Sequence, residues 1–178
     1  MKMYRKIFLS FMVVMLILTA SGTGHARGRT QRIGDVTQFV APVWALFLTM
    51  NRQDSEGTEQ LLWSYAANMA VTYGLKAAIH APRPQGSGTD SFPSGHAASG
   101  FSGASFITRR YGFRDAVIPY AFGVFTAYSR VHARRHYTRD VIASFVISEA
   151  IARLLVTEHP SRLQIGITPN GMSLRYTF

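Results

Sequence analysis

Four stretches of 14 to 18 residues lack Asp, Glu, Lys and Arg, and they constrain the fold of this 178-residue chain more than any other feature. They are Val36–Asn51, Gln60–Leu75, Ser91–Thr108 and Ala116–Ser129. Each is shorter than the roughly 20 apolar residues that cross a bilayer, and small or polar residues dilute most of them. Such lengths suit the core helices of a bundle, so we expect a soluble or peripheral helical domain.

The chain as a whole predicts an all-α bundle of about five to six helices. Thr58 is a suitable N-cap for one helix, and apolar residues follow it at alternating spacings of four and three. We expect this stripe to face the core: Leu62, Ala66, Met69, Tyr73 and Lys76. The other helices are expected over Val36–Met50, Ser94–Arg109, Asp115–Arg130 and Thr138–Val156.

The two ends of the chain differ from this helical part. Residues 1–26 place basic residues before an apolar run, Ile7–Ala20, and finish in small residues, which is the order of a secretory signal peptide. We expect export, with either cleavage after Ala26 or retention of the segment as an anchor. In residues 163–178, apolar residues alternate with other residues on both sides of the turn Thr168-Pro169-Asn170-Gly171. This pattern predicts a β-hairpin packed on the bundle. Residues 27–162 then form the single helical domain.

The charge and the missing cysteines indicate the kind of partner and compartment. The formal net charge is +10 at pH 7, and there is no cysteine. A basic exported protein suits anionic partners, such as phosphorylated substrates or peripheral contact with an anionic membrane. No nucleic-acid motif accompanies the charge, so we expect no nucleic acid. The lack of cysteine excludes disulfides and thiolate-bound metal, and it fits the periplasm or the outer face of the inner membrane.

Two motifs suggest a phosphate-binding site. Lys76 lies on the apolar stripe, where an unpaired ammonium is costly to bury and requires an anion. Arg83, held between two prolines, suits bidentate contact with a phosphate. Ser94 and Gly95 begin a helix whose free N–H groups form an anion site, and His96 in its first turn can act as a proton donor.

A third motif offers a candidate nucleophile, although an isolated His-x3-Asp pair is more often structural. His136 and Asp140 are four residues apart, so on a helix they share a face and can hydrogen-bond. A carboxylate on one ring nitrogen orients an imidazole and makes the other nitrogen more nucleophilic. Arg130, with Ser129 beside it, is expected to close the phosphate site from the preceding helix. Attack of His136 on phosphorus would form a phosphohistidine.

The order Lys-x6-Arg-Pro, Pro-Ser-Gly-His and Ser-Arg-x5-His-x3-Asp resembles the type 2 phosphatidic acid phosphatase superfamily, which includes bacterial acid phosphatases and vanadium haloperoxidases. The resemblance implies a helical bundle with its site at one end. It implies that the phosphate is bound by Lys76, Arg83, Ser94, Gly95 and Arg130. It also implies that His136 attacks while Asp140 holds it, and that His96 protonates the leaving oxygen. No metal or other cofactor is expected, and vanadate is expected to inhibit.

The expected function is therefore an exported phosphatase that hydrolyses phosphomonoesters through a phosphohistidine without metal. Its substrate is a phosphorylated lipid or a small soluble phosphoester. The basic charge and the aromatic residues Trp44, Phe47 and Trp63 favour the lipid, although core packing explains these aromatics equally well. Two alternatives stay open, a vanadate-dependent haloperoxidase and a non-catalytic envelope protein that binds phosphate groups.

Overall fold

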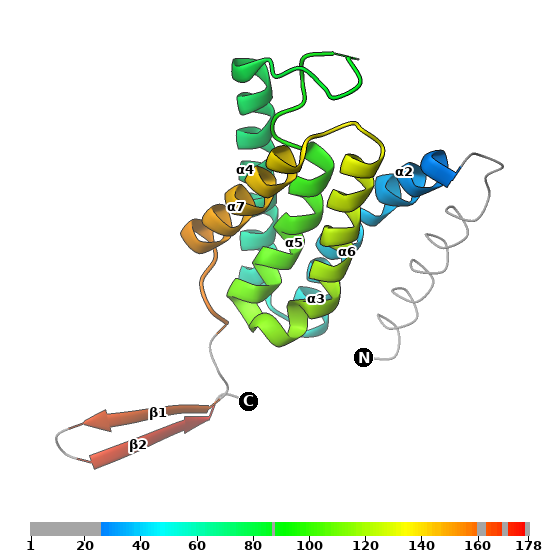
Figure 1. The fold of residues 1–178 in the computed structure, drawn as a ribbon. Helices are drawn as coiled ribbons and strands as arrows, with labels where there is room; N and C mark the ends of the chain where they lie inside the picture. Colours follow the sequence, from blue (N-terminus) through cyan, green and yellow to red (C-terminus); the bar gives the residue numbers. More distant parts are fainter. Residues whose placement is uncertain (1–25, 87, 160–162, 169–170, 177–178) are drawn as a thin grey trace.

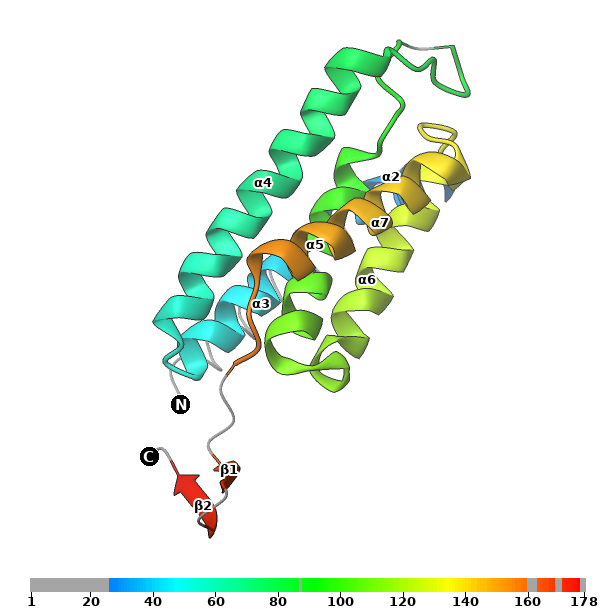
Figure 2. The ribbon, with the colours of Figure 1, turned by 90° about the vertical axis from the view of Figure 1, so that its left-hand side faces the viewer.

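The computed structural model describes residues 26–86, 88–159, 163–168 and 171–176, and their helices form one bundle (Figures 1 and 2). The helices are α2 (Ala26–Thr37), α3 (Val40–Asn51), α4 (Ser55–Ile79), α5 (Gly95–Tyr111), α6 (Phe113–His132) and α7 (Thr138–Leu155). The predicted helical bundle is confirmed. The predicted signal peptide lies outside the described residues, apart from its last residue, Ala26.

Helix α5 lies at the centre of the bundle and packs against α3, α4, α6 and α7 (Figure 1). Its small residues allow these neighbours to come close. A Cβ atom at Gly103 would lie only 2.3 Å from the backbone carbon of Ala41, so only glycine fits where α3 crosses α5. Towards its end, Phe106 and Ile107 are fully buried in the main apolar core. The centre of the bundle is thus a helix that is buried almost all round.

Helix α4 begins earlier than predicted and is turned to a different face. Its N-cap is Asp54 rather than Thr58, and the Asp54 carboxylate accepts a hydrogen bond from the Gly57 N–H at 2.9 Å. The predicted core stripe points outwards, with Leu62 63% exposed and Tyr73 60% exposed. Those two predictions are wrong, because sequence spacing shows that a helix has an apolar face but not what that face contacts.

The buried face of α4 is largely polar instead. It consists of Gly57, Leu61, Ser64, Asn68 and Thr72. The Asn68 side-chain amide donates to the backbone carbonyl of Ala98 on α5 at 2.9 Å, and the Tyr65 and Ser99 hydroxyls lie 2.9 Å apart. Helix α4 therefore buries hydrogen-bonding groups and exposes large apolar side chains.

Helix α2 falls where no helix was predicted, before Val36. It packs mainly against α6. With α3 it makes a helical segment, Gly28–Asn51, of 24 residues. Among the described residues this is the one segment long and apolar enough, by length and composition, to cross a membrane. The expectation that the charge-free stretch Val36–Asn51 belongs to a segment too short to cross a membrane needs this correction.

The chain ends in two strands that pair with each other. Strand β1 (Leu163–Thr168) runs antiparallel to β2 (Gly171–Tyr176), with Leu163 opposite Tyr176 and Thr168 opposite Gly171. Figure 1 shows the pair apart from the helices. The predicted packing of a hairpin on the bundle is therefore not seen.

Candidate active site

The predicted site residues come together at one end of the bundle, around a cavity of about 480 Å³. Lys76 reaches it from α4, Arg83 from the loop after α4, His96 from the start of α5, and His136 from the loop before α7. Gly95 also lines the cavity. Ser94, Arg130 and Asp140 are buried and bonded to neighbouring parts of the same end. Residues up to 64 positions apart in the sequence thus meet at one place.

Two cations of the site share Asp90, a residue that the sequence gave no reason to select. The Lys76 ammonium donates to the backbone carbonyl of Asp90 at 2.5 Å. Arg83 binds the Asp90 carboxylate with two hydrogen bonds of 2.8 Å. Burial lowers the pKa of Lys76, and the Asp90 carboxylate partly opposes this shift. Because the Asp90 side chain is 55% exposed, a phosphate can replace it on the guanidinium.

The start of α5 is held firmly by α7. Ser94 is the N-cap, as predicted. Its backbone N–H donates to the Asp140 carbonyl at 3.2 Å, and its own carbonyl accepts from the Ser144 hydroxyl at 2.9 Å. At Gly95 a Cβ atom would lie 3.7 Å from the Tyr73 hydroxyl, at the cavity wall. The free N–H groups of this helix end therefore face a cavity lined by cations.

His136 is bound differently from the sequence prediction. It lies in the loop between α6 and α7, so it does not share a helical face with Asp140. Its Nδ1 atom is 3.7 Å from the nearer Asp140 oxygen, too far for a hydrogen bond. Nδ1 lies instead 2.7 Å from the backbone carbonyl of Ser91. A carbonyl only accepts, so Nδ1 carries the hydrogen and Nε2 keeps its lone pair. The predicted direct hydrogen bond is wrong.

Asp140 reaches His136 through Ser91. The Asp140 carboxylate is fully buried. Its Oδ2 atom accepts from the Ser91 hydroxyl at 2.5 Å and from the Tyr137 N–H at 2.9 Å. Asp140 thus fixes both the residue whose carbonyl orients His136 and the turn that follows His136. Neither residue type nor spacing could have selected Ser91 from the sequence.

The surroundings of His136 favour a neutral ring. Burial is the main cause that lowers its pKa to about 4, and the nearby Lys76 and Arg83 charges act in the same direction. The Ser91 carbonyl and Asp140 oppose the shift without cancelling it. At neutral pH the ring therefore has an available lone pair, as a nucleophile requires.

Arg130 and His96 meet at a second unpredicted carboxylate, that of Asp35 on α2. Asp35 Oδ1 accepts from Arg130 Nη1 at 2.7 Å and lies 3.0 Å from His96 Nε2. Burial and the Arg130 charge lower the pKa of His96, whereas Asp35 raises it. The sequence offered one signal that was not used, since Asp35 is the first acidic residue of the chain and the next is Asp54.

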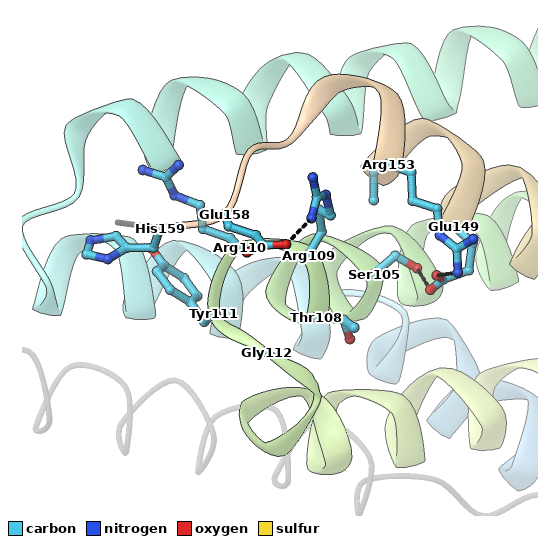
Figure 3. A pocket seen from close by; sticks show the side chains of 11 residues that line it. Ser105, Thr108, Arg109, Arg110, Tyr111, Gly112, Glu149, Arg153, Glu158 and His159 are labelled. Carbon is cyan, nitrogen blue, oxygen red and sulfur yellow. Dashed lines mark hydrogen bonds and ion pairs between the residues drawn. The ribbon is translucent and has the colours of Figure 1, made fainter. Parts of the chain in front are cut away.

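A different cavity, of about 420 Å³, lies near the opposite end of the bundle, where α5 and α7 finish (Figure 3). Its charged side chains are paired. Arg109 contacts Glu158 at 2.6 Å, and Ser105 donates to Glu149 at 2.7 Å. Beside it, Arg110 forms a bidentate pair with Asp54 at 2.6 and 2.8 Å. None of the predicted site residues lies there.

Comparison with known families identifies the fold. The sequence model of the type 2 phosphatidic acid phosphatase (PAP2) superfamily matches residues 58–163, more than half of the chain. That range includes Lys76, Asp140 and all the predicted site residues between them. The chain belongs to the PAP2 superfamily. The predicted family is thereby confirmed, and the protein is a phosphomonoester hydrolase of this type.

Two relatives of known activity are similar to this PAP2 protein along most of its length. The lipid A 4'-phosphatase of Helicobacter pylori is 28% identical over 170 residues, which cover 89% of this chain and 85% of the relative. The lipid A 1-phosphatase of Porphyromonas gingivalis is 30% identical over 150 residues, covering 78% of this chain but only 32% of that larger protein. Neither similarity supports the haloperoxidase or the non-catalytic alternative.

Two solved structures share the fold of this PAP2 protein. LpxE from Aquifex aeolicus has a TM-score of 0.61 and 18% identity, covering 82% of this chain and 93% of that one. A transmembrane PAP2 type phosphatidylglycerolphosphate phosphatase from Bacillus subtilis has a TM-score of 0.51 and 19% identity, covering 83% and 93%. These likenesses support the helical bundle and lend no support to the C-terminal hairpin.

Proposed function

We propose that this protein is a lipid phosphatase of the bacterial envelope that removes a phosphate from a phosphorylated glycolipid of the lipid A type. One observation carries the proposal. Lys76, Arg83, His96 and His136 line a single cavity, in a chain whose relatives include two lipid A phosphatases. The cavity thus offers cations, a nucleophile and a proton donor to one phosphate group.

In the proposed first step, the phosphate replaces Asp90 on Arg83 and binds Lys76, the Ser94 hydroxyl and the Gly95 N–H. Arg130 completes the binding set from α6. These donors stabilise the charge that develops on the phosphate oxygens during transfer. Nε2 of His136 attacks phosphorus, while Nδ1–H stays on the Ser91 carbonyl. The product is a phosphohistidine on His136.

In this same step the bond between phosphorus and the leaving oxygen breaks, and the leaving oxygen takes a proton from His96. Water then attacks the phosphohistidine, which releases inorganic phosphate and restores His136. We propose no metal, because side-chain cations supply the positive charge. Treatment with EDTA should leave the rate unchanged, and a strong loss that added Mg²⁺ or Zn²⁺ reverses would contradict this part of the proposal.

The outward faces of the helices support contact with lipid. Helix α7 buries polar or small residues, among them Ser144 and Ser148, and exposes Ile142 and Val146. An apolar cavity of about 650 Å³ lies between α5, α6 and α7, lined by Phe101, Phe113, Tyr120, Val124, Ile142 and Phe145, with other residues. Polar interiors and apolar exteriors are typical of helices surrounded by acyl chains. We therefore propose a membrane-associated enzyme.

Export and domain division belong to the same proposal. We propose that residues 1–26 direct the chain to the periplasmic side, as a cleaved signal peptide or a retained anchor. Residues 27–162 form the phosphatase domain, and residues 163–178 form a tail. Expression of a fusion to a reporter that is active only in the periplasm tests the direction of export. If the periplasmic reporter is inactive, and a reporter that is active only in the cytoplasm is active when fused at the same position, the proposed export is contradicted.

The test of the substrate compares phosphate release from three compounds by the full chain purified in detergent. The compounds are bisphosphorylated lipid A, phosphatidic acid and an aryl phosphate. We expect vanadate-sensitive release that is fastest from lipid A. Equal or faster release from phosphatidic acid would overturn the glycolipid assignment, and no release from any compound would overturn the phosphatase assignment. His136→Ala serves as the inactive control.

A further inference from the structure

Asp35 reaches the site from α2, outside the three motifs that suggested the chemistry. Its Oδ1 atom lies 2.7 Å from Arg130 Nη1 and 3.0 Å from His96 Nε2. One carboxylate oxygen thus joins a proposed phosphate ligand on α6 to the proposed proton donor on α5. No other described residue forms an ion pair with both groups.

The fold brings α2 close enough for this contact. A Cβ atom at Gly34 would lie 1.8 Å from the Ser129 hydroxyl oxygen and 2.7 Å from Arg130 Nη2, so glycine is required there. Arg130 also donates to the backbone carbonyl of Gln31 at 2.5 Å. Helix α2 is therefore built against the guanidinium at more than one point, and Arg130 is only 2% exposed.

The charges around His96 make the carboxylate important for its protonation. The charged groups that face the ring among the described residues are Asp35 on α2, Arg130 on α6 and Lys76 on α4. Burial, Arg130 and Lys76 all lower the pKa of His96. Asp35 alone among these groups raises it, both by its charge and by its hydrogen bond. The pKa of His96 lies below its usual value even with Asp35 in place, and loss of Asp35 would lower it further.

We propose that Asp35 is a positioning residue for the leaving-group step, holding His96 and Arg130 through one carboxylate oxygen. The inference rests on the proposed phosphatase function. Nε2–H of His96 stays on Asp35, and the proton on Nδ1 passes to the leaving oxygen as the P–O bond breaks. The electron pair of that bond ends on the leaving oxygen, His96 becomes neutral, and Asp35 stays ionised throughout.

The leaving group of the substrate provides the decisive measurement. An alkyl phosphate leaves as a strongly basic alkoxide and needs a proton, whereas p-nitrophenolate is stable without one. In Asp35→Asn the side chain keeps its size and loses its charge. We expect kcat for an alkyl phosphate to fall about 10²-fold or more, within the range of general acid catalysis. We expect kcat for p-nitrophenyl phosphate to fall much less.

The pH profile gives a readout that a purely structural role would not move. Activity on the alkyl phosphate requires protonated His96, so it is lost as the pH rises through the pKa of that ring. Asp35→Asn removes the group that raises this pKa, so the alkaline limb should move to lower pH. Asp35→Glu keeps the charge. It should restore part of the rate and move the alkaline limb of the pH profile part of the way back towards the wild-type pH.

Asp115→Asn is the matched control. Asp115 also pairs with an arginine, Arg52, at 2.6 Å, but near the other end of the bundle. It should change neither the substrate ratio nor the pH profile. Equal losses on both substrates, or an unmoved alkaline limb, would overturn the proposal. So would tighter phosphate binding with faster turnover, which would mean that Asp35 competes with the phosphate. A wild-type protein inactive on both substrates would instead overturn the phosphatase function itself.

Discussion

The two ends of the bundle both concentrate arginines and carboxylates, but they hold them in different ways. Near the distal end, the Arg110 and Asp54 side chains are 1% and 4% exposed and bind each other directly. At the site end, the carboxylates that meet Arg83 and Arg130 are 55% and 43% exposed. The Arg110–Asp54 pair is thus closed to solvent, whereas the carboxylates of the two site-end pairs are about half exposed.

This difference separates stability from binding. A buried ion pair cannot exchange its partner for a ligand, and breaking it leaves an unpaired charge in the core. An exposed carboxylate contributes little to stability, but it keeps a cation oriented until a substrate anion arrives. We therefore expect substitutions at the site end to lower activity and substitutions at the distal end to lower the free energy of unfolding.

The largest effect is expected for His136→Ala. Removal of the nucleophile should lower kcat at least about 10³-fold. The free energy of unfolding should fall by only about 1–3 kcal/mol, because the Ser91 carbonyl loses its donor. Phosphate release and urea unfolding of the same preparation check both expectations. A variant with a normal rate would remove His136 from the mechanism.

At the distal end, Asp54→Asn should lower the free energy of unfolding by about 3–5 kcal/mol, because it leaves Arg110 buried without an anion. Asp115→Asn, in the half-exposed pair with Arg52, should cost less than about 1 kcal/mol. Chemical denaturation measures both variants. Below its melting temperature, Asp54→Asn should keep normal kcat. Equal destabilisation by the two variants would show that the buried pair contributes no more to the free energy of unfolding than the half-exposed pair.

Acid should weaken the two ends in separate pH windows. The pKa of His136 is about 4 in the folded protein, so between about 6.5 and 4 only the unfolded chain gains a proton, which costs about 3 kcal/mol of stability. Burial alone would raise the pKa of Asp54, but hydrogen bonds from Arg110, Tyr111 and Gly57 hold it well below its usual value. Its contribution is present above about pH 4 and is lost as the pH falls further.

Urea unfolding across this pH range tests the assignment of the two windows. His136→Ala should remove most of the loss of stability between about pH 6.5 and 4, and His96, whose pKa is also lowered, should account for the rest. Asp54→Asn should remove the loss at lower pH and leave the first window in place. If His136→Ala loses as much unfolding free energy between about pH 6.5 and 4 as the wild type does, a group other than His136 must account for that loss.

The smallest effects are expected for a matched pair of serines. Ser91 donates to Asp140 at the site end, and Ser105 donates to Glu149 near the distal end, at 2.5 and 2.7 Å. Ser91→Ala should lower kcat about 10-fold, because a hydrogen bond to a charged group contributes about 1.5–3 kcal/mol. Ser105→Ala should leave kcat unchanged and lower the melting temperature. A similar loss of kcat in both variants would show that the serines do not act locally.

The sequence alone determined the bundle and the eight candidate residues. Charge-free stretches of helical length predicted α3, α4, α5 and α6 but not α2. Ser94 was recognisable as an N-cap because capping is a local interaction. The spacing of Lys76, Arg83, His96, Arg130, His136 and Asp140 was enough to suggest one site. Four of them, Lys76, Arg83, His96 and His136, line one cavity.

Only the tertiary structure decided what each of these residues contacts. The i, i+4 spacing of His136 and Asp140 suggested a direct bond, but α7 begins after His136, and Ser91 comes between them from 45 residues away. Asp35 reaches Arg130 across 95 residues. The outward stripe of α4 likewise depends on which neighbours it meets. Local sequence encodes a helix and its two faces, whereas the partner of a side chain depends on contacts between distant segments, which no local pattern records.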